Sequence, residues 1–170
     1  AEVRHVDVGT ELQSPFNNED IYSIEDLNAV IYKLRQLNPV ARIAAKTVSV
    51  SGAAMVAAGI AKAGADIVWM AGHSGGTGAS PLDTIKYGGL PVEYGVQMSH
   101  LVLAESGLRD QAKLVGDGGI QTGLHAVRMF LLGADAVGLG TIFMETIGCV
   151  QQRVCHLGGC TVGVATQRKD

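Results

Sequence analysis

The sequence is poor in several residue types that mark particular protein classes. Its 170 residues include 3 cysteines, 4 prolines, 1 tryptophan and only 5% aromatic residues. No apolar run reaches the roughly 20 residues of a membrane-spanning helix, so we expect no membrane segment. The net charge is −3 and the 13 basic residues form no stripe, which is not the charge pattern of a nucleic-acid binder. An odd number of cysteines also argues against a disulfide scaffold.

What is abundant is apolar and small. Hydrophobic residues make up 47% of the chain and 23 residues are glycine, which is typical of small-residue helices packed on buried strands. A chain of this length can form one domain with a real core, and we predict a single domain over 1–170. The first residues show no basic segment followed by an apolar one, so we expect no signal peptide. The odd number of clustered cysteines favours a reducing cytoplasm as the location.

Strand and helix patterns alternate along the chain. Ser23 and Asp26 resemble a capping box, and an apolar stripe from Leu27 to Leu37 predicts a helix that Asn38-Pro39 ends. After it, four apolar segments predict strands at 41–48, 65–72, 113–119 and 134–141, and helical patterns occur at 51–64, 92–108 and 122–133. We also predict a short helix before the first cysteine.

This alternation predicts an α/β fold with a parallel sheet covered by helices. It leaves two architectures, the doubly wound sheet and the (β/α) barrel. Glycine turns after both of the last two strands favour the barrel, in which paired phosphate-binding loops follow strands seven and eight. A full barrel takes about 250 residues. We therefore predict the C-terminal half, about four βα units, of a (β/α)8 TIM-type barrel.

The two glycine turns form a candidate phosphate site. The first turn leads into the helical segment 122–133 and the second into the predicted short helix, so backbone N–H groups there would attract an anion. The alternative is a pair of ordinary glycine turns. The candidate cofactor-binding residues are Asp117, Gly118, Gly119, Gly138, Gly140 and Thr141.

Charged residues at the ends of strands and in one long loop are further candidates. Lys46 lies inside an apolar strand and must be compensated or exposed at the barrel mouth, although a lysine at a strand end can also simply reach water. The stretch from Gly72 to Glu93 reads as a loop of about twenty residues, a length that is usually functional or disordered. Its small residues, Gly75 and Gly76 among them, would let the backbone approach a planar ligand. Glu93 and Lys86 are its polar candidates. The histidines His5, His100 and His125 have no partner spacing and read as structural or surface residues.

The three cysteines stand close together as Cys149-x5-Cys155-His156-x3-Cys160, beside three glycines. Clustered thiolates suit a soft metal site. Three ligands without a fourth would fit an iron–sulfur cluster that lacks one corner, while a closed zinc site would need the adjacent His156. Ordinary free thiols are the third interpretation.

Taken together, these motifs resemble the flavin-containing synthase domain of glutamate synthase. The resemblance covers nearly the whole chain from about Ser14 onward, and the cysteine spacing joined to Gly-Gly-Thr-Gly-Ala-Ser-Pro at 75–81 is its most specific part. The phosphate loops alone occur in other flavin barrels too. The matching stretches are Asp20-Ile-Tyr-Ser-Ile-Glu-Asp-Leu27, the strand around Lys46, residues 75–81, Leu90-Pro-x-Glu93, Asp117-Gly-Gly, Thr122-Gly123, the cysteine segment 149–160 and residues 161–167.

The resemblance implies a (β/α)8 barrel that carries FMN and a [3Fe-4S] cluster. In that family electrons pass through the cluster to FMN, which reduces 2-iminoglutarate, made from 2-oxoglutarate and ammonia, to L-glutamate. Carried over, Lys46 and Glu93 would be catalytic, with Lys46 at the flavin and the 2-oxoglutarate carboxylate. Cys149, Cys155 and Cys160 would bind the cluster, and Gly118, Gly119, Gly140 and Thr141 would hold the FMN phosphate. The electron donor would be a partner subunit or ferredoxin.

The family's amidotransferase domain and first half-barrel have no counterpart here, so this chain alone is not expected to hydrolyse glutamine. We expect it to pair through its open sheet, either as a homodimer or with a complementing N-terminal half-barrel. Two alternatives stay open. One is a catalytically incomplete, self-associating half-barrel, and the other is a non-flavin phosphate-ligand barrel with a zinc site.

Overall fold

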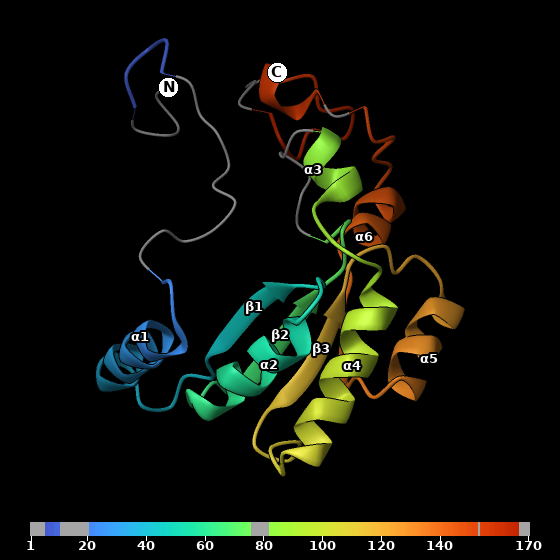
Figure 1. The fold of residues 1–170 in the computed structure, drawn as a ribbon. Helices are drawn as coiled ribbons and strands as arrows, with labels where there is room; N and C mark the ends of the chain where they lie inside the picture. The colour runs from blue at the N-terminus through green and yellow to red at the C-terminus, as the bar shows by residue number, and fades with distance from the viewer. Residues whose placement is uncertain (1–5, 11–20, 76–81, 153, 167–170) are drawn as a thin grey trace.

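The computed structural model describes residues 6–10, 21–75, 82–152 and 154–166 (Figure 1). Its strands are β1 (Ala44–Val48), β2 (Ile67–Ala71), β3 (Lys113–Asp117) and β4 (Ala136–Gly138). Its α-helices are α1 (Ile24–Leu37), α2 (Ala53–Lys62), α3 (Leu82–Tyr87), α4 (Val92–Glu105), α5 (Gly123–Leu131) and α6 (Thr141–Thr146), followed by a 3-10 helix at Cys155–Leu157. Among the described residues, no helix is both long and apolar enough to cross a membrane.

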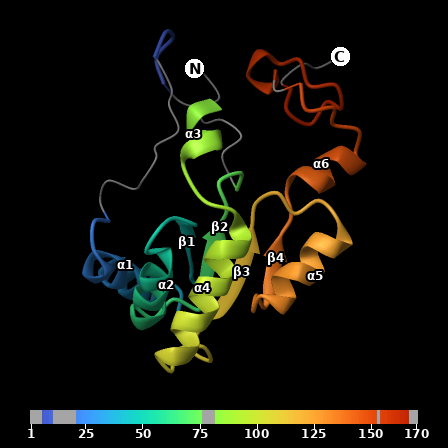
Figure 2. The same cartoon turned by 45° about the vertical axis from the view of Figure 1, so that its right-hand side comes forward.

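The four strands form one parallel sheet in the order β1-β2-β3-β4. Each strand pairs with the next one along the chain, and the order never reverses as it does in a doubly wound sheet. Helices α2, α4 and α5 lie along one face of the sheet (Figure 2). Both the parallel sheet and the helical cover confirm the predicted α/β class, and the sequential order fits part of a TIM-type barrel.

Local sequence signals explain why the helices begin where they do. In α1 the Ser23 hydroxyl accepts from the backbone N–H of Asp26, and the Asp26 carboxylate accepts from the Ser23 N–H, so the predicted capping box is confirmed. Thr122 caps α5 in the same way, by accepting from the N–H of His125. The helix α4 begins directly after Pro91, whose fixed φ suits a position at a helix start.

The core lies between the sheet and its helices. Val68 and Met70 of β2 and Leu114 of β3 are fully buried on this side, and they meet Val96 and Leu103 of α4 in the same apolar cluster. Small residues of α2, mainly alanines, allow close packing with α4. On the opposite face of the sheet, β1 presents exposed positions in strict alternation, so one face of the sheet is the core and the other is partly open to solvent.

A salt bridge closes the amino end of the sheet between β3 and β4. The Asp135 carboxylate accepts from the Leu114 N–H at 2.7 Å and pairs with Arg109 at 2.9 Å. The same Arg109 side chain donates to the Gly133 carbonyl oxygen at 2.9 Å. Its Nε also donates to Nδ1 of His100, which makes that histidine structural, as expected.

The same arrangement occurs two units earlier, between β1 and β2. The Asp66 carboxylate accepts from the Ile43 N–H at 2.7 Å and pairs with Arg35 at 3.0 Å, while Arg35 donates to the Gly64 carbonyl. Residues 64–66 and 133–135 both read Gly-Ala-Asp, and both glycines have positive φ. The segments β1-α2-β2 and β3-α5-β4 are therefore two copies of one βαβ unit.

The structure corrects some predicted boundaries. The stretch from Gly72 to Glu93 is not one continuous loop, because Leu82–Tyr87 form the helix α3 within it. Strand β1 begins at Ala44 rather than at 41, because the N–H of Ile43 bonds to the Asp66 carboxylate rather than to a carbonyl of the sheet. The strands predicted at 113–119 and 134–141 are shorter, since their last residues form the turns described next.

Candidate functional site

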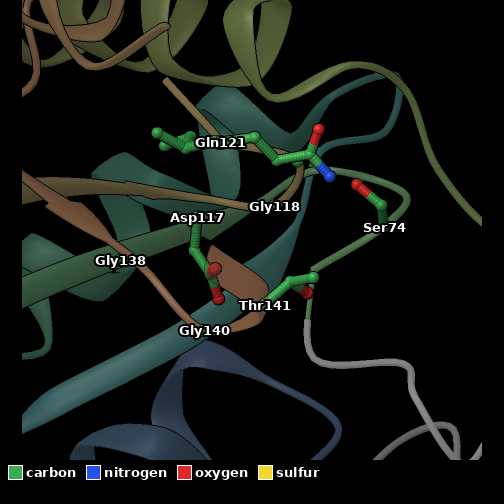
Figure 3. Close-up of a pocket in the computed structure, with 9 residues that line it drawn as sticks. Ser74, Asp117, Gly118, Gln121, Gly138, Gly140 and Thr141 are labelled. Atoms are coloured by element: carbon green, nitrogen blue, oxygen red, sulfur yellow. The ribbon is translucent and has the colours of Figure 1, made fainter. Parts of the chain in front are cut away.

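A pocket lies at the carboxyl ends of β3 and β4 (Figure 3). Parallel α/β proteins bind ligands at this edge of the sheet. The pocket brings together residues from the loop after β2 and from both predicted glycine turns. The residues that line it are Ser74, Asp117, Gly118, Gly119, Ile120, Gln121, Gly138, Gly140 and Thr141. All six residues predicted in the two glycine turns are thus in one place.

The turn after β3 requires glycine for two reasons. Gly118 and Gly119 have φ values of +112° and +73°, which side-chain-bearing residues rarely adopt. A Cβ on Gly118 would also stand 2.9 Å from the backbone nitrogen of Gly75. The loops after β2 and β3 are joined there, because the Gly72 N–H donates to the Asp117 carbonyl at 2.7 Å. This contact sets the wall of the pocket.

The amides in the turn are less free than the sequence predicts. The N–H of Gln121 donates to Nδ1 of His125 at 3.4 Å, and the N–H of His125 donates to Thr122. One N–H in the first turn of α5 and one just before its N-cap are therefore already satisfied within the segment 121–125. An anion in the pocket would have to be held by the glycine turns themselves and by the Thr141 hydroxyl, which Figure 3 shows at the pocket together with the Asp117 carboxylate.

Lys46 does not stand alone in its strand. Its Nζ lies 2.7 Å from Oδ2 of Asp117, two strands away, and 5.7 Å above the ring of Trp69 on the strand between. The Trp69 Nε1–H donates to the same Asp117 oxygen at 3.2 Å. The lysine side chain is 45% exposed and the aspartate 17%. The charge of Lys46 is thus compensated and also open to solvent on the uncovered face of the sheet.

The other predicted residues have different places. Gly75 packs under the pocket, where a Cβ would touch Ala71 at 3.0 Å. Glu93 is exposed in the first turn of α4 and does not line the pocket, and Lys86 is exposed on α3. Gly76 lies outside the described residues, as does most of the stretch 75–81. The catalytic role of Glu93 stays a prediction.

The cysteine segment follows α6, beyond the carboxyl end of the sheet (Figure 1). All three cysteines are free, and Cys155 is exposed. In the described part of the chain, no group of three or more His, Cys, Asp or Glu side chains is close enough to hold a metal ion. The three thiols are thus near in sequence but are not gathered around one point.

Cys160 nevertheless has the surroundings of a thiolate ligand. Hydrogen bonds from the backbone N–H groups of Ala165, Val162, Val164 and Gly163 lower the pKa of the Cys160 thiol against the opposing effect of burial. Backbone N–H groups directed at cysteine sulfur favour the anionic form and tune iron–sulfur clusters. The surroundings of Cys160 therefore fit a thiolate ligand.

Four residues at the site were not predicted from the sequence. Ser74, Ile120 and Gln121 line the pocket next to residues that were predicted, and Trp69 contacts both Lys46 and Asp117. Only Trp69 carried a signal of its own, because it is the single tryptophan of the chain and lies in a strand that leads to the predicted site. The contact of Lys46 with Asp117, 71 residues apart, has no signature in the sequence.

Comparison with known proteins gives a consistent result. A sequence model described as the conserved region in glutamate synthase matches residues 1–170. The chain is 48% identical over 170 residues to the ferredoxin-dependent glutamate synthase of Pyropia yezoensis and 50% identical over 169 residues to ferredoxin-dependent glutamate synthase 2 of Synechocystis sp.. It is also 48% identical over 167 residues to the glutamate synthase [NADPH] large chain of Azospirillum brasilense. These alignments cover 98–100% of the chain but 11% of each relative.

Proposed function

Since the chain belongs to the glutamate synthase family, we propose that it is the part of a glutamate synthase that binds FMN and a [3Fe-4S] cluster. The reaction would be reductive formation of L-glutamate from 2-oxoglutarate and ammonia. The observation that carries this proposal is the pocket at the ends of β3 and β4, where both glycine turns meet beside the Lys46–Asp117 pair.

The fit of a flavin phosphate to this pocket rests on its backbone. Gly119 and Gly140 add no side chain of their own to the pocket, and a Cβ on Gly140 would meet nothing within 4 Å, so there is open space beside it. The Thr141 hydroxyl can donate to a phosphate oxygen. FMN, when bound, supplies hydride transfer, and a [3Fe-4S] cluster supplies single-electron transfer.

Lys46 is the cation best placed to act on a bound ligand. Its Nζ is held by Asp117, and its side chain is 45% exposed on the open face of the sheet. An ammonium group there would neutralise a carboxylate of 2-oxoglutarate or stabilise negative charge that develops near a flavin. Glu93 is a second catalytic candidate. Because it is exposed and does not line the pocket, the segment before α4 would have to move closer to the pocket for Glu93 to act there.

Cys149, Cys155 and Cys160 would supply the three thiolates of the cluster. The hydrogen bonds to Cys160 from residues 162–165 support this role. Gathering the sulfur atoms around a cluster would couple the segment's conformation to metal binding, as thiolate sites commonly do. Three free thiols also suit a reducing compartment such as the cytoplasm.

Ferredoxin is the electron donor we propose, because several relatives are named ferredoxin-dependent. A donor that uses NADPH is the alternative, following the name of the Azospirillum brasilense relative. The open edges of β1 and β4 would be covered by a second copy or by an N-terminal half-barrel, which would complete the barrel proposed for the whole domain.

The phosphate site can be tested by comparing FMN with riboflavin, which lacks the phosphate. We expect the chain to bind FMN at least tenfold more tightly, measured by quenching of flavin fluorescence. Gly140→Ala adds a methyl group inside the pocket and should raise the dissociation constant of FMN about tenfold, the equivalent of about 1.4 kcal/mol. The affinity for riboflavin should not change.

Gly123→Ala is the matched control, because this glycine also begins a helix and its Cβ would also meet nothing within 4 Å. It does not line the pocket, so both flavin affinities should stay at the wild-type value. Equal binding of FMN and riboflavin by the wild-type chain would refute the phosphate site.

For the cluster, anaerobic addition of iron and sulfide should produce broad visible absorbance that Cys160→Ser abolishes. Zinc uptake without such absorbance would favour the zinc alternative instead.

A further inference from the structure

The open face of the sheet holds a small polar cluster around one oxygen atom. Asp117 Oδ2 receives both the Lys46 ammonium, at 2.7 Å, and the Trp69 indole N–H, at 3.2 Å. Since the carboxylate is 17% exposed, both interactions are partly shielded from water. Charge-assisted hydrogen bonds of this kind are shorter and stronger than neutral ones. The Lys46 ammonium is therefore held in place by the Asp117 carboxylate, which the Trp69 indole in turn holds, although the lysine side chain itself is flexible.

Trp69 also contacts the Lys46 ammonium directly, through the face of its ring. The Lys46 Nζ stands 5.7 Å from the centre of the indole ring, within the range of a cation–π contact. The ring itself fits because residue 138 is glycine, where a Cβ would lie 2.9 Å from Trp69 Cζ2 and 3.0 Å from Asp117 Cβ. The glycine of the second turn thus serves the indole as well as the pocket.

The four residues Lys46, Trp69, Asp117 and Gly138 occupy equivalent positions in the two βαβ units. In the two βαβ units, Ile43 corresponds to Leu114 and Asp66 to Asp135, through their equivalent hydrogen bonds. The strand registers agree, because Ala44 pairs with Ile67 and Val115 pairs with Ala136. Counted forward from these pairs, Lys46 corresponds to Asp117 and Trp69 corresponds to Gly138.

At one equivalent position the two copies carry opposite charges, Lys46 and Asp117. At the other they carry the largest and the smallest residue, Trp69 and Gly138. A lysine in both copies would bring two cations together, and a tryptophan in both would collide. The two units differ at the very positions where they face each other across the sheet. The cluster therefore depends on different residues at equivalent positions of the two βαβ units.

We propose that Trp69 and Asp117 are positioning residues that hold the Lys46 ammonium beside the pocket. Asp117 fixes the ammonium through its Oδ2, and Trp69 fixes both the carboxylate and the ammonium. We call the contacts among Lys46, Trp69 and Asp117 the clamp. Its role in ligand binding rests on the proposed function, whereas the clamp itself is a property of the chain without ligand. The two can therefore be tested separately.

The clamp can be measured without any cofactor, because the chain contains 1 tryptophan and its indole N–H gives one resonance in a nitrogen–proton NMR spectrum. Asp117→Asn and Lys46→Met should each shift this resonance clearly. Asp110→Asn is the control, since Asp110 is an exposed loop carboxylate and its substitution changes the same charge. An indole resonance that moves no more in Asp117→Asn than in Asp110→Asn would overturn the clamp.

The positioning role is measured by flavin titration of two further variants. Trp69→Phe keeps an aromatic ring but loses the N–H donor, and Trp69→Leu loses both. If the clamp positions Lys46 for FMN, the dissociation constant should rise severalfold in Trp69→Phe and about tenfold in Trp69→Leu, with circular dichroism unchanged. Wild-type affinity in both variants would overturn the positioning role.

Failure of the wild-type chain to bind FMN would refute the proposed function. In that case the NMR comparison alone decides whether the clamp exists, and Lys46 would be positioned for another ligand or for none. A shifted indole resonance in Asp117→Asn would then still support the clamp.

Discussion

Replacing Asp135 with alanine tests whether the Arg109–Asp135 salt bridge, at the amino end of β3 and β4, stabilises the sheet. The change removes the acceptor of the Leu114 N–H, at 2.7 Å, and the partner of Arg109, at 2.9 Å. The two side chains are 25% and 20% exposed, so water compensates only part of the loss. The Leu114 N–H, on a fully buried residue, would be left without this acceptor.

The size of the effect follows from these contacts. A hydrogen bond to a charged group contributes about 1.5–3 kcal/mol, and an unsatisfied buried donor costs about 1–3 kcal/mol. Because these two amounts describe overlapping interactions and the site is partly exposed, we expect a loss of about 2–3 kcal/mol in the free energy of unfolding. For a chain of this length that corresponds to a fall in Tm of roughly 4–12 °C.

Urea and thermal unfolding monitored by circular dichroism would measure this loss. Asp110→Ala, an exposed carboxylate in the loop before β3, is the control and should change the free energy by less than about 0.5 kcal/mol. A double-mutant cycle with Arg109→Met should give a coupling of about 1 kcal/mol or more. An Asp135→Ala chain as stable as the control would refute the view that the Arg109–Asp135 salt bridge holds β3 and β4 together.

Three further predictions follow from the fold. Hydrogen bonding to the Ile43 N–H and to Arg35 lowers the pKa of Asp66, so its contribution to stability should be present above the unfolded pKa of about 3.9 and lost as the pH falls through the lower folded value. The stability gap between the wild type and Asp66→Asn, measured by urea unfolding, should therefore shrink below about pH 4 and stay constant above pH 5; a gap independent of pH would contradict this. Gly138→Ala should lower stability by about 1–3 kcal/mol through overpacking and change the emission of Trp69, which its Cβ would approach to 2.9 Å; unaltered emission would count against the packing described here. Leu114→Ala, at 0% exposure, should cost about 2–5 kcal/mol, whereas Leu124→Ala, at 61% exposure, should cost less than about 0.5 kcal/mol, and equal unfolding midpoints would be the contrary result.

Local sequence patterns were sufficient for most of the secondary structure. The capping box of Ser23 and Asp26 marked the start of α1, and the Asn38-Pro39 pair marked its end. Apolar runs located all four strands of the sheet, although their predicted ends reached into the glycine turns. The exception was α3, which lies in a glycine-rich stretch and at six residues is too short to show a long apolar stripe.

The candidate site was partly predictable for a similar reason. Glycine turns at the ends of consecutive parallel strands must lie at the same edge of the sheet, so Gly118 and Gly140 could be assigned to one pocket in advance. The three cysteines could be recognised by spacing alone, but spacing does not fix where their sulfur atoms lie. In the described residues they are not gathered into a metal site.

What the sequence by itself determined is therefore the order of strands and helices, the glycine turns and the family to which the chain belongs. These depend on residues close together along the chain, whose propensities and periodicity are read directly. The tertiary structure alone decided that Lys46 and Trp69 both donate to one oxygen atom of Asp117. It also decided that the same Arg–Asp salt bridge occurs at two places in the sheet. Such contacts join residues 26 to 71 positions apart, and strand register brings them together, which no local pattern encodes.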